Sequence, residues 1–366
     1  MNTHLRRAVP IGWAAALVIG VVVPFVVSDY DLLDLTRMLA VAMAVAGLNL
    51  LLGHSGQISV GHGALFGLGG YAAIILVATY GWPWWSAVPV GGAVCLALGL
   101  LLGVLGLTMG GANLGLLTIA VAAIFPLLLI RLKPITGGTF GIFMAHSPIE
   151  PPAWSGLTEP QFGFLVCLAA LALTLLVLRN LVTGRLGRAF AAVRTSTLLA
   201  AANGVNVNRT KLMAFAVSAA VAGTGGAFYA LVAAIAVPDS YLVPFSITLL
   251  AASVVGGSRT WAGSLVGAAI VIYLPKLAEN IVGAESAGNW SQLVYACGLV
   301  LTLIVAPSGL IGDLSRLAHR ATGPQRGRTS SARIPCGPGQ RGSPQQADVR
   351  PHVGPDREDT HGALQK

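Results

Sequence analysis

Long apolar runs separated by short polar segments make up most of the chain between residues 9 and 306. Each run is nearly free of charged residues, and most approach the roughly 20 residues that a helix needs to cross a bilayer. The pattern predicts ten membrane spans, at 9–27, 34–52, 57–79, 85–107, 113–131, 160–179, 211–236, 245–257, 262–278 and 290–306. We therefore expect residues 1–320 to form an all-α, polytopic transmembrane helix bundle.

Charged residues divide between alternate connections of the predicted bundle. The connection 180–210, the turn "SRTWAG" and the carboxyl tail are basic, whereas the opposite connections carry most of the aspartate and glutamate. Because basic loops remain in the cytoplasm, this division and the even number of spans both place the two chain ends inside. Four cations, Arg37, Arg131, Lys133 and Lys276, lie near predicted outer span ends, where we expect their side chains to snorkel to the interface.

Two apolar segments contain more glycine and polar residues than a simple spanning helix. "GHSGQISVGHGALFGLGG", from Gly53 to Gly70, holds seven glycines, and a short apolar run in the other half ends at Gly256 and Gly257. Interrupted helices are tolerated in a bilayer only where protein or a watery cavity covers the backbone. Paired interruptions in two halves of a chain are typical of a substrate path. The alternative is tight packing through small residues, without a path.

The first of these segments also supplies candidate pathway residues. Gln57, Ser59 and His62 are polar groups that an interrupted helix would direct toward a cavity. A histidine within a membrane span is a functional candidate by default, but a neutral imidazole bonded to a neighbouring helix is an equal alternative for His62. His54, in the turn before the third span, is interpreted as an interfacial residue.

Composition excludes several classes of protein. Hydrophobic residues make up 55% of the chain, charged residues 10%, and mean hydropathy is +0.77, so the chain is an integral membrane protein. The net charge of +9 lies in loops and tail, which favours membrane topology over nucleic-acid binding. Residues 321–366 are rich in proline and glycine with no aliphatic pattern, so we expect a disordered cytoplasmic tail.

The sequence contains no signature of an enzyme. A phosphate-binding loop, a zinc-protease motif and a nucleophile elbow are all missing. The four cysteines, Cys95, Cys167, Cys297 and Cys336, show neither a CxxC pair nor disulfide spacing. We therefore expect no catalytic residue, metal site or cofactor. Titratable groups are also scarce inside the predicted spans, whereas proton-driven transporters commonly carry relays of them.

The connection from Thr183 to Lys211 is the longest predicted cytoplasmic segment. Four apolar residues, Phe190, Val193, Leu198 and Ala201, recur at spacings typical of a surface helix. Gly204 follows this run and is expected to end the helix. Because an exposed apolar face needs a partner or a lipid headgroup to cover it, the segment is a candidate docking site for a cytoplasmic protein.

Several motifs, in one order, resemble the membrane permease subunits of branched-chain amino acid ABC importers, specifically the LivM-type subunit. "GLNLLLGHSGQISVGHGALFGLGGYAA" is similar to the segment after the family's second helix, with Asn49, Gln57, Ser59 and His62 in matching positions. "ITGGTFGI", "VPDSY", "VVGGSRTWAGSLVGA" and "PSGL" resemble further family motifs. The family's cytoplasmic coupling loop, at about 181–210, and the helix after it are matched at several positions. Those taken as coupling residues are Gly187, Arg188, Arg194, Ala201, Gly204 and Lys211.

This resemblance implies a transport subunit of a bacterial cytoplasmic (inner) membrane. The implied partners are a second permease of the LivH type, two cytoplasmic ATP-binding subunits that hydrolyse ATP, an extracytoplasmic amino acid binding protein and membrane lipid. The implied pathway residues are Asn49, Gln57, Ser59, His62, Gly256 and Gly257. Free helix ends and neutral polar groups suit a zwitterion without buried charges.

Two departures from the family accompany the resemblance. Acidic residues usual after the coupling-loop arginine are replaced by "TSTLLAAAN", and a glutamate common in the fifth span is missing from "TIAVAAIFPLLL". The alternatives are an ion-coupled secondary transporter of a small polar solute, which would need coupling residues in its spans, and a membrane scaffold without transport.

Overall fold

The computed structural model describes residues 18–108 and 113–282. The predicted span at 290–306, the predicted tail at 321–366 and most of the predicted first span lie outside the described residues. Cys297 and Cys336 lie outside them too, whereas Cys95 and Cys167 are buried free thiols.

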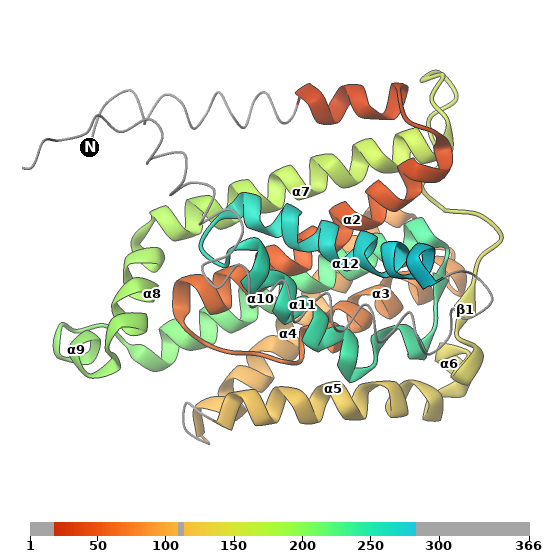
Figure 1. The fold of residues 1–366 in the computed structure, drawn as a ribbon. Helices are drawn as coiled ribbons and strands as arrows, with labels where there is room; N and C mark the ends of the chain where they lie inside the picture. Colours follow the sequence, from red (N-terminus) through yellow and green to blue (C-terminus); the bar gives the residue numbers. More distant parts are fainter. Residues whose placement is uncertain (1–17, 109–112, 283–366) are drawn as a thin grey trace, which may run out of the picture. The chain divides into compact units, whose positions relative to one another are not determined.

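The described residues form a bundle of helices with two very short strands (Figure 1). After a helical turn at residues 18–22, the helices are η1 (Val23–Phe25), α2 (Asp29–Leu48), η2 (Asn49–Ser55), α3 (His62–Ala78), α4 (Trp84–Thr108), α5 (Asn113–Arg131), α6 (Lys133–Thr136), η3 (Gly138–Phe140), α7 (Glu159–Thr183), α8 (Arg185–Thr195), α9 (Thr197–Ala202), α10 (Val207–Ala233), η4 (Pro238–Tyr241), α11 (Val243–Gly256) and α12 (Trp261–Val282). The strands are β1 (Ile142–Phe143) and β2 (Ile235–Ala236).

Five of these helices are long and apolar enough to cross a membrane: Asp29–Ser55, Trp84–Leu107, Leu114–Arg131, Glu159–Thr183 and Val207–Ala233. Three shorter apolar helices, at His62–Ala78, Val243–Gly256 and Trp261–Leu277, complete the set found among the described residues. The helical membrane class is therefore confirmed, while the count of ten spans stays a prediction. The third predicted span begins at residue 62 rather than 57, because the chain between η2 and α3 is not helical.

Helix α10 lies at the centre of the bundle and packs along α2, α3 and α4. Small residues allow this close approach. A Cβ added to Gly69 of α3 would lie 2.1 Å from the carbonyl oxygen of Gly223 in α10, and one added to Gly226 would lie 1.8 Å from that of Phe66. The backbones are thus in direct contact, which is how helices associate in lipid without a hydrophobic driving force between them.

The two strands close one end of the bundle, which we call the β1–β2 end. Ile142 pairs with Ala236 and Phe143 with Ile235 in an antiparallel register, joining the connection after α5 to the end of α10. The all-α prediction did not include this pair. The six acidic residues whose side chains the structure describes occur in η4, the first two turns of α2, the connection before α7 and the first residue of α7. These residues are Asp29, Asp31, Asp34, Glu150, Glu159 and Asp239.

Asp34 is an ion-pair partner for Lys276 and Arg37, two cations that were expected to snorkel to the interface. Lys276 of α12 forms an ion pair with the buried Asp34 carboxylate, and Arg37 lies 3.6 Å from the same carboxylate. Lys276 also lies 5.4 Å from the ring centre of Tyr30. Neither side chain therefore needs to snorkel, because each has a partner within the bundle.

Candidate functional site

The break between η2 and α3 is the most irregular part of the bundle. Gly56 ends the π-helix η2 with φ of +73°, a left-handed conformation that glycine adopts without steric cost. The backbone N–H of Gln57 then donates to the carbonyl of Leu51 at 3.1 Å, which completes the helix end. Residues 57–61 run without helical structure until His62 begins α3. The interrupted helix expected from the sequence is therefore present.

Ser59, His62 and Ser218 form a buried hydrogen-bonded chain across this break. His62 Nδ1 lies 3.0 Å from Ser59 Oγ, and His62 Nε2 lies 2.7 Å from Ser218 Oγ. Ser218 donates its own hydroxyl proton to the carbonyl of Gly47 at 2.6 Å. The Ser218 oxygen must then accept from His62, so the proton of the neutral ring sits on Nε2 and Nδ1 accepts from Ser59. This arrangement is the structural alternative considered for His62.

The Gly256–Gly257 interruption in the other half meets the same region. Asn49 of η2 donates from Nδ2 to the carbonyl of Thr260 at 3.3 Å and accepts from Ser253 Oγ at 2.6 Å. Gly257 has φ of +107° and begins the turn between α11 and α12. A Cβ on Gly256 would lie 2.0 Å from the carbonyl oxygen of Gly263. The two interruptions, distant in sequence, are therefore joined by η2.

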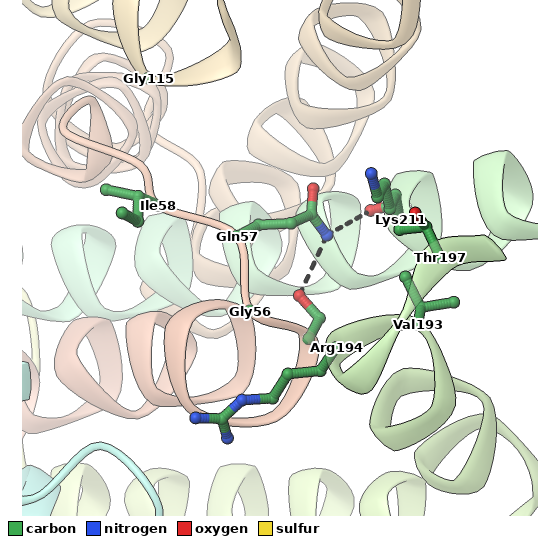
Figure 2. Close-up of a pocket in the computed structure, with 9 residues that line it drawn as sticks. Gly56, Gln57, Ile58, Gly115, Val193, Arg194, Thr197 and Lys211 are labelled. Atoms are coloured by element: carbon green, nitrogen blue, oxygen red, sulfur yellow. Dashed lines mark hydrogen bonds between the residues drawn. The ribbon is translucent and has the colours of Figure 1, made fainter. Parts of the chain in front are cut away.

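A pocket of about 390 Å³ opens beside the break, at what we call the α8–α9 end of the bundle. It is lined by Ser55, Gly56, Gln57, Ile58, Gly115, Val193, Arg194, Thr197 and Lys211 (Figure 2). The Gln57 amide nitrogen donates to Ser55 Oγ at 3.0 Å and to the Lys211 carbonyl at 3.2 Å. Gln57, a predicted pathway residue, thus shares a pocket with the predicted coupling residues Arg194 and Lys211. Asn49, Ser59 and His62 do not line this pocket and are buried in the bundle.

The connection that carries the coupling residues is two helices rather than one. Ser196, with extended backbone, separates α8 from α9 and caps α9 by accepting from the N–H of Leu199 at 3.3 Å. Phe190 and Val193 are buried against the bundle, whereas Leu198 and Ala201 are exposed. The expectation of one apolar face with all four residues is therefore wrong, because the break at Ser196 turns α9 away.

Two predicted coupling residues, Gly204 and Gly187, have defined local roles. Gly204 follows α9 with φ of +78°, and its N–H donates to the Ala201 carbonyl at 3.0 Å, so it ends the helix as expected. A Cβ on Gly187 would lie 1.7 Å from the carbonyl oxygen of Val182, so this glycine allows the sharp corner between α7 and α8. Arg188 is exposed on α8.

The two most exposed apolar groups of this connection are Leu198, which the apolar spacing had already indicated, and its neighbour Leu199, which it had not. Leu198 is 80% exposed and Leu199 is 63% exposed, both on α9. A pair of leucines two residues after a capping serine, within a polar segment, is the signal that could have identified Leu199.

Arg194 links the connection to the broken helix. Its Nη1 donates to the carbonyl of Gly53 in the last turn of η2. Burial, and after it the charge of the nearby Arg259, lower the pKa of the Arg194 guanidinium from its ordinary value, but an arginine still carries its charge at neutral pH. No acidic residue occurs anywhere in 35–149 or 160–238, so a backbone carbonyl takes the place of a carboxylate partner.

A bundle of long apolar helices around an interrupted helix defines the chain as a polytopic α-helical membrane protein. The family model described as "Branched-chain amino acid transport system / permease component" matches residues 33–304, and the chain belongs to this family.

Its relatives include two proteins named "High-affinity branched-chain amino acid transport system permease protein LivM". The one from Salmonella typhimurium strain LT2 is 30% identical over 318 residues, and the one from Escherichia coli K12 is 30% identical over 320 residues. Each match covers 81% of this chain and 73% of the relative. A "Probable branched-chain amino acid transport permease protein LivH" of Methanocaldococcus jannaschii is 28% identical over 262 residues, or 67% of this chain and 80% of the relative. No solved structure matches the chain.

Proposed function

We propose that this chain is a permease subunit of an ABC importer that moves branched-chain or related amino acids across the bacterial cytoplasmic membrane. ATP hydrolysis in two partner subunits drives it, a second permease of the LivH type completes the pathway, and an extracytoplasmic binding protein delivers the substrate. Membership of the permease family and the names of the relatives support the substrate class.

The observation that carries the proposal is the pocket at the α8–α9 end. It combines Gln57, from the break in the interrupted helix, with Arg194, from the connection that an ATPase would engage, and Lys211, from the first turns of α10. A permease driven by a partner needs such a junction, because a force applied at its surface must reach the helices around the pathway. The exposed Leu198 and Leu199 give a partner subunit an apolar contact at the same end.

The distribution of charge supports the proposed orientation. Seven cations, and no acidic residue, occur in the described part of the α8–α9 end. They are Arg179, Arg185, Arg188, Arg194, Arg209, Lys211 and Arg259. The β1–β2 end carries the acidic residues described above. By the preference of positive residues for the cytoplasm, α8 and α9 face the partner ATPases and the strand pair faces the binding protein.

The interrupted helices suit a zwitterionic substrate. Pathway residues Asn49, Gln57, Ser59 and His62 are neutral, and Gly256 and Gly257 end the neighbouring helix α11. A carboxylate and an ammonium group can be bound by backbone dipoles and neutral polar groups without a buried charge, which would be costly in lipid.

The test is transport by a reconstituted complex. The chain is co-purified with the second permease, the two ATPases and the binding protein, and placed in liposomes with ATP on the side of the ATPases. We expect uptake of labelled leucine that depends on ATP and on the binding protein, and that other branched-chain amino acids compete away more strongly than amides or urea. The same chain reconstituted alone should be inert. Accumulation driven by an ion gradient in that lone preparation would overturn the proposal.

A further inference from the structure

We propose that Arg194 is a positioning residue that fastens α8 to the end of the interrupted helix. Movement of α8 is then passed to η2 and, through η2, to the turn between α11 and α12. This inference rests on the proposed function, because the movement in question is the one that a partner ATPase would impose. It gives Arg194 an internal role rather than a place on the docking surface.

The first argument is the bond itself. Carbonyl groups in the last turn of a helix have no partner within the helix and carry the negative end of its dipole. The Arg194 guanidinium occupies this position at the end of η2 by donating to Gly53. Figure 2 shows the guanidinium turned away from Gln57 and lying against the η2 ribbon. The Arg194 guanidinium therefore contacts the bundle, although the residue as a whole is exposed on its surface helix.

The second argument is that α8 and the end of η2 are in direct van der Waals contact. A Cβ added to Gly56, directly after η2, would lie 2.9 Å from Cγ of Arg194 and 3.6 Å from its Cα. Gly56 also has positive φ, so a side chain would be strained there in any case. The chain thus passes against the backbone and stem of Arg194 at a position where any larger residue would push α8 outward.

The third argument is that η2 is held equally closely on its other side. A Cβ on Gly53 would lie 1.8 Å from the carbonyl oxygen of Ser258, in the turn between α11 and α12. The carbonyl that accepts from Arg194 and the backbone that presses on Ser258 belong to the same residue. Asn49 adds hydrogen bonds to Ser253 and Thr260, as described above. A displacement of η2 therefore moves the α11–α12 turn with it.

Other cations of this connection lack such a link. Within residues 179–211, Arg194 is the only described lysine or arginine whose side chain hydrogen-bonds another element of the bundle. Arg179, near the end of α7, is exposed and has no side-chain contact of this kind. It is a matched control, since Arg179→Gln removes the same charge from the same end of the bundle.

The experiment uses the complete complex in lipid nanodiscs and liposomes, with Arg194→Gln, Arg194→Lys and Arg179→Gln compared with the unmodified chain. In Arg194→Gln we expect uptake per ATP hydrolysed to fall about tenfold or more, the effect of losing a hydrogen bond from a charged donor. The amount of ATPase that co-purifies should be unchanged. Arg194→Lys keeps the charge but loses the planar fork of the guanidinium, so its uptake per ATP should lie between those of Arg194→Gln and the unmodified chain. Uptake per ATP in Arg179→Gln should equal that of the unmodified chain.

A structural readout separates this inference from the transport proposal. Spin labels are placed at Ala191→Cys on α8 and Ile58→Cys after η2, in the complex with the four native cysteines of this chain replaced by alanine. Pulsed electron spin resonance measures the distance between the two labels. We expect one narrow distribution of this distance in the chain that keeps Arg194, a broader one in Arg194→Gln, and a narrow one in Arg179→Gln. Arg194→Lys provides the same comparison if Arg194→Gln fails to reach the membrane.

Two results would overturn the inference. An unchanged distance distribution in Arg194→Gln would show that the residue does not fasten α8, and loss of the ATPases would place it on the docking surface. If the unmodified complex shows no ATP-driven uptake, the proposed function fails, but the distance distributions still decide whether Arg194 holds the two elements together.

Discussion

His62 Nε2 lies 2.7 Å from Ser218 Oγ, although 156 residues separate the two in sequence. The bond joins the first residue of α3 to the middle of α10, and both side chains are fully buried. Because Ser218 gives its own proton to the carbonyl of Gly47, the chain of bonds continues into α2. One imidazole therefore links α3 to the central helix α10 and, through Ser218, to α2.

Replacing His62 by alanine should therefore destabilise the protein, by about 1–3 kcal/mol, because it leaves buried hydroxyl groups without a partner. Ser218→Ala should have a similar effect, and the double variant should cost less than the sum of the two. Thermal unfolding in detergent, combined in a double-mutant cycle, measures this coupling. If His62→Ala instead keeps its stability and raises only the KM for uptake, the residue serves the substrate path and the coupling argument is wrong.

Gly69→Ala should destabilise the packing of α3 against α10, since the new Cβ would lie 2.1 Å from the Gly223 carbonyl oxygen. Overpacking of this kind costs about 1–3 kcal/mol. The matched control is Gly163→Ala on α7, where nothing lies within 4 Å of the added Cβ. That variant should be neutral or more stable, because alanine favours a helix. Equal melting temperatures for the two variants would contradict the close contact.

The double substitution Leu198→Ser and Leu199→Ser should weaken association with the ATPase partner and abolish ATP-driven uptake. Both side chains are exposed on α9, so the fold of the chain should be unaffected. Co-purification of the ATPases and expression in the membrane are measured together. Leu186→Ser, a less exposed position on α8, is the control and should retain the ATPases. Full retention by the double variant would remove α9 from the docking surface.

Position 204 allows a test of conformation without a change of contacts. Gly204 has φ of +78°, and nothing lies within 4 Å of an added Cβ, so only backbone strain opposes a side chain there. Asparagine tolerates the left-handed region and valine does not. We expect Gly204→Asn to transport normally and Gly204→Val to insert into the membrane but lose coupled uptake. Normal uptake by Gly204→Val would show that coupled uptake does not depend on the left-handed backbone at the end of α9.

Asp34→Asn should loosen the contact between α2 and α12 by removing the partner of Lys276 and Arg37. Both cations are partly exposed, so the loss in stability should be small, about 1 kcal/mol. The double variant, Asp34→Asn with Lys276→Gln, should recover part of this lost stability, because no unpaired ammonium remains. Thermal unfolding of the unmodified chain, the two single variants and the double variant gives the coupling energy between Asp34 and Lys276. Strict additivity of the two substitutions would mean that the ion pair contributes nothing.

The hydrophobic pattern was sufficient to predict the long helices, because each of α2, α4, α5, α7 and α10 is a nearly uniform apolar run. It was also sufficient to predict an interruption before α3, because glycine is dense there. The starting residue of α3 was not predictable, since it depends on the left-handed turn at Gly56 and on a π-helix that tertiary contacts stabilise.

Contacts between distant segments left no signal in the local sequence. Asn49 and Thr260 are 211 residues apart, and their hydrogen bond depends on how η2 packs against the α11–α12 turn. The strand pair was missed because two residues per strand are too few for a periodic pattern. The division between α8 and α9 was visible in principle, since Ser196 is a capping residue, but the apolar spacing across it suggested one continuous helix.

The short ribbon formed by β1 and β2 has a mechanical consequence. Helix α10 begins beside the pocket, where the Lys211 carbonyl accepts from Gln57, and continues for 27 residues until its last turn leads directly into β2. At 1.5 Å per residue this is a rod about 40 Å long. If a partner ATPase pushes along this axis, as the proposed function requires, the displacement reaches the other end of the bundle, where the ribbon joins α10 to the connection between α5 and α7.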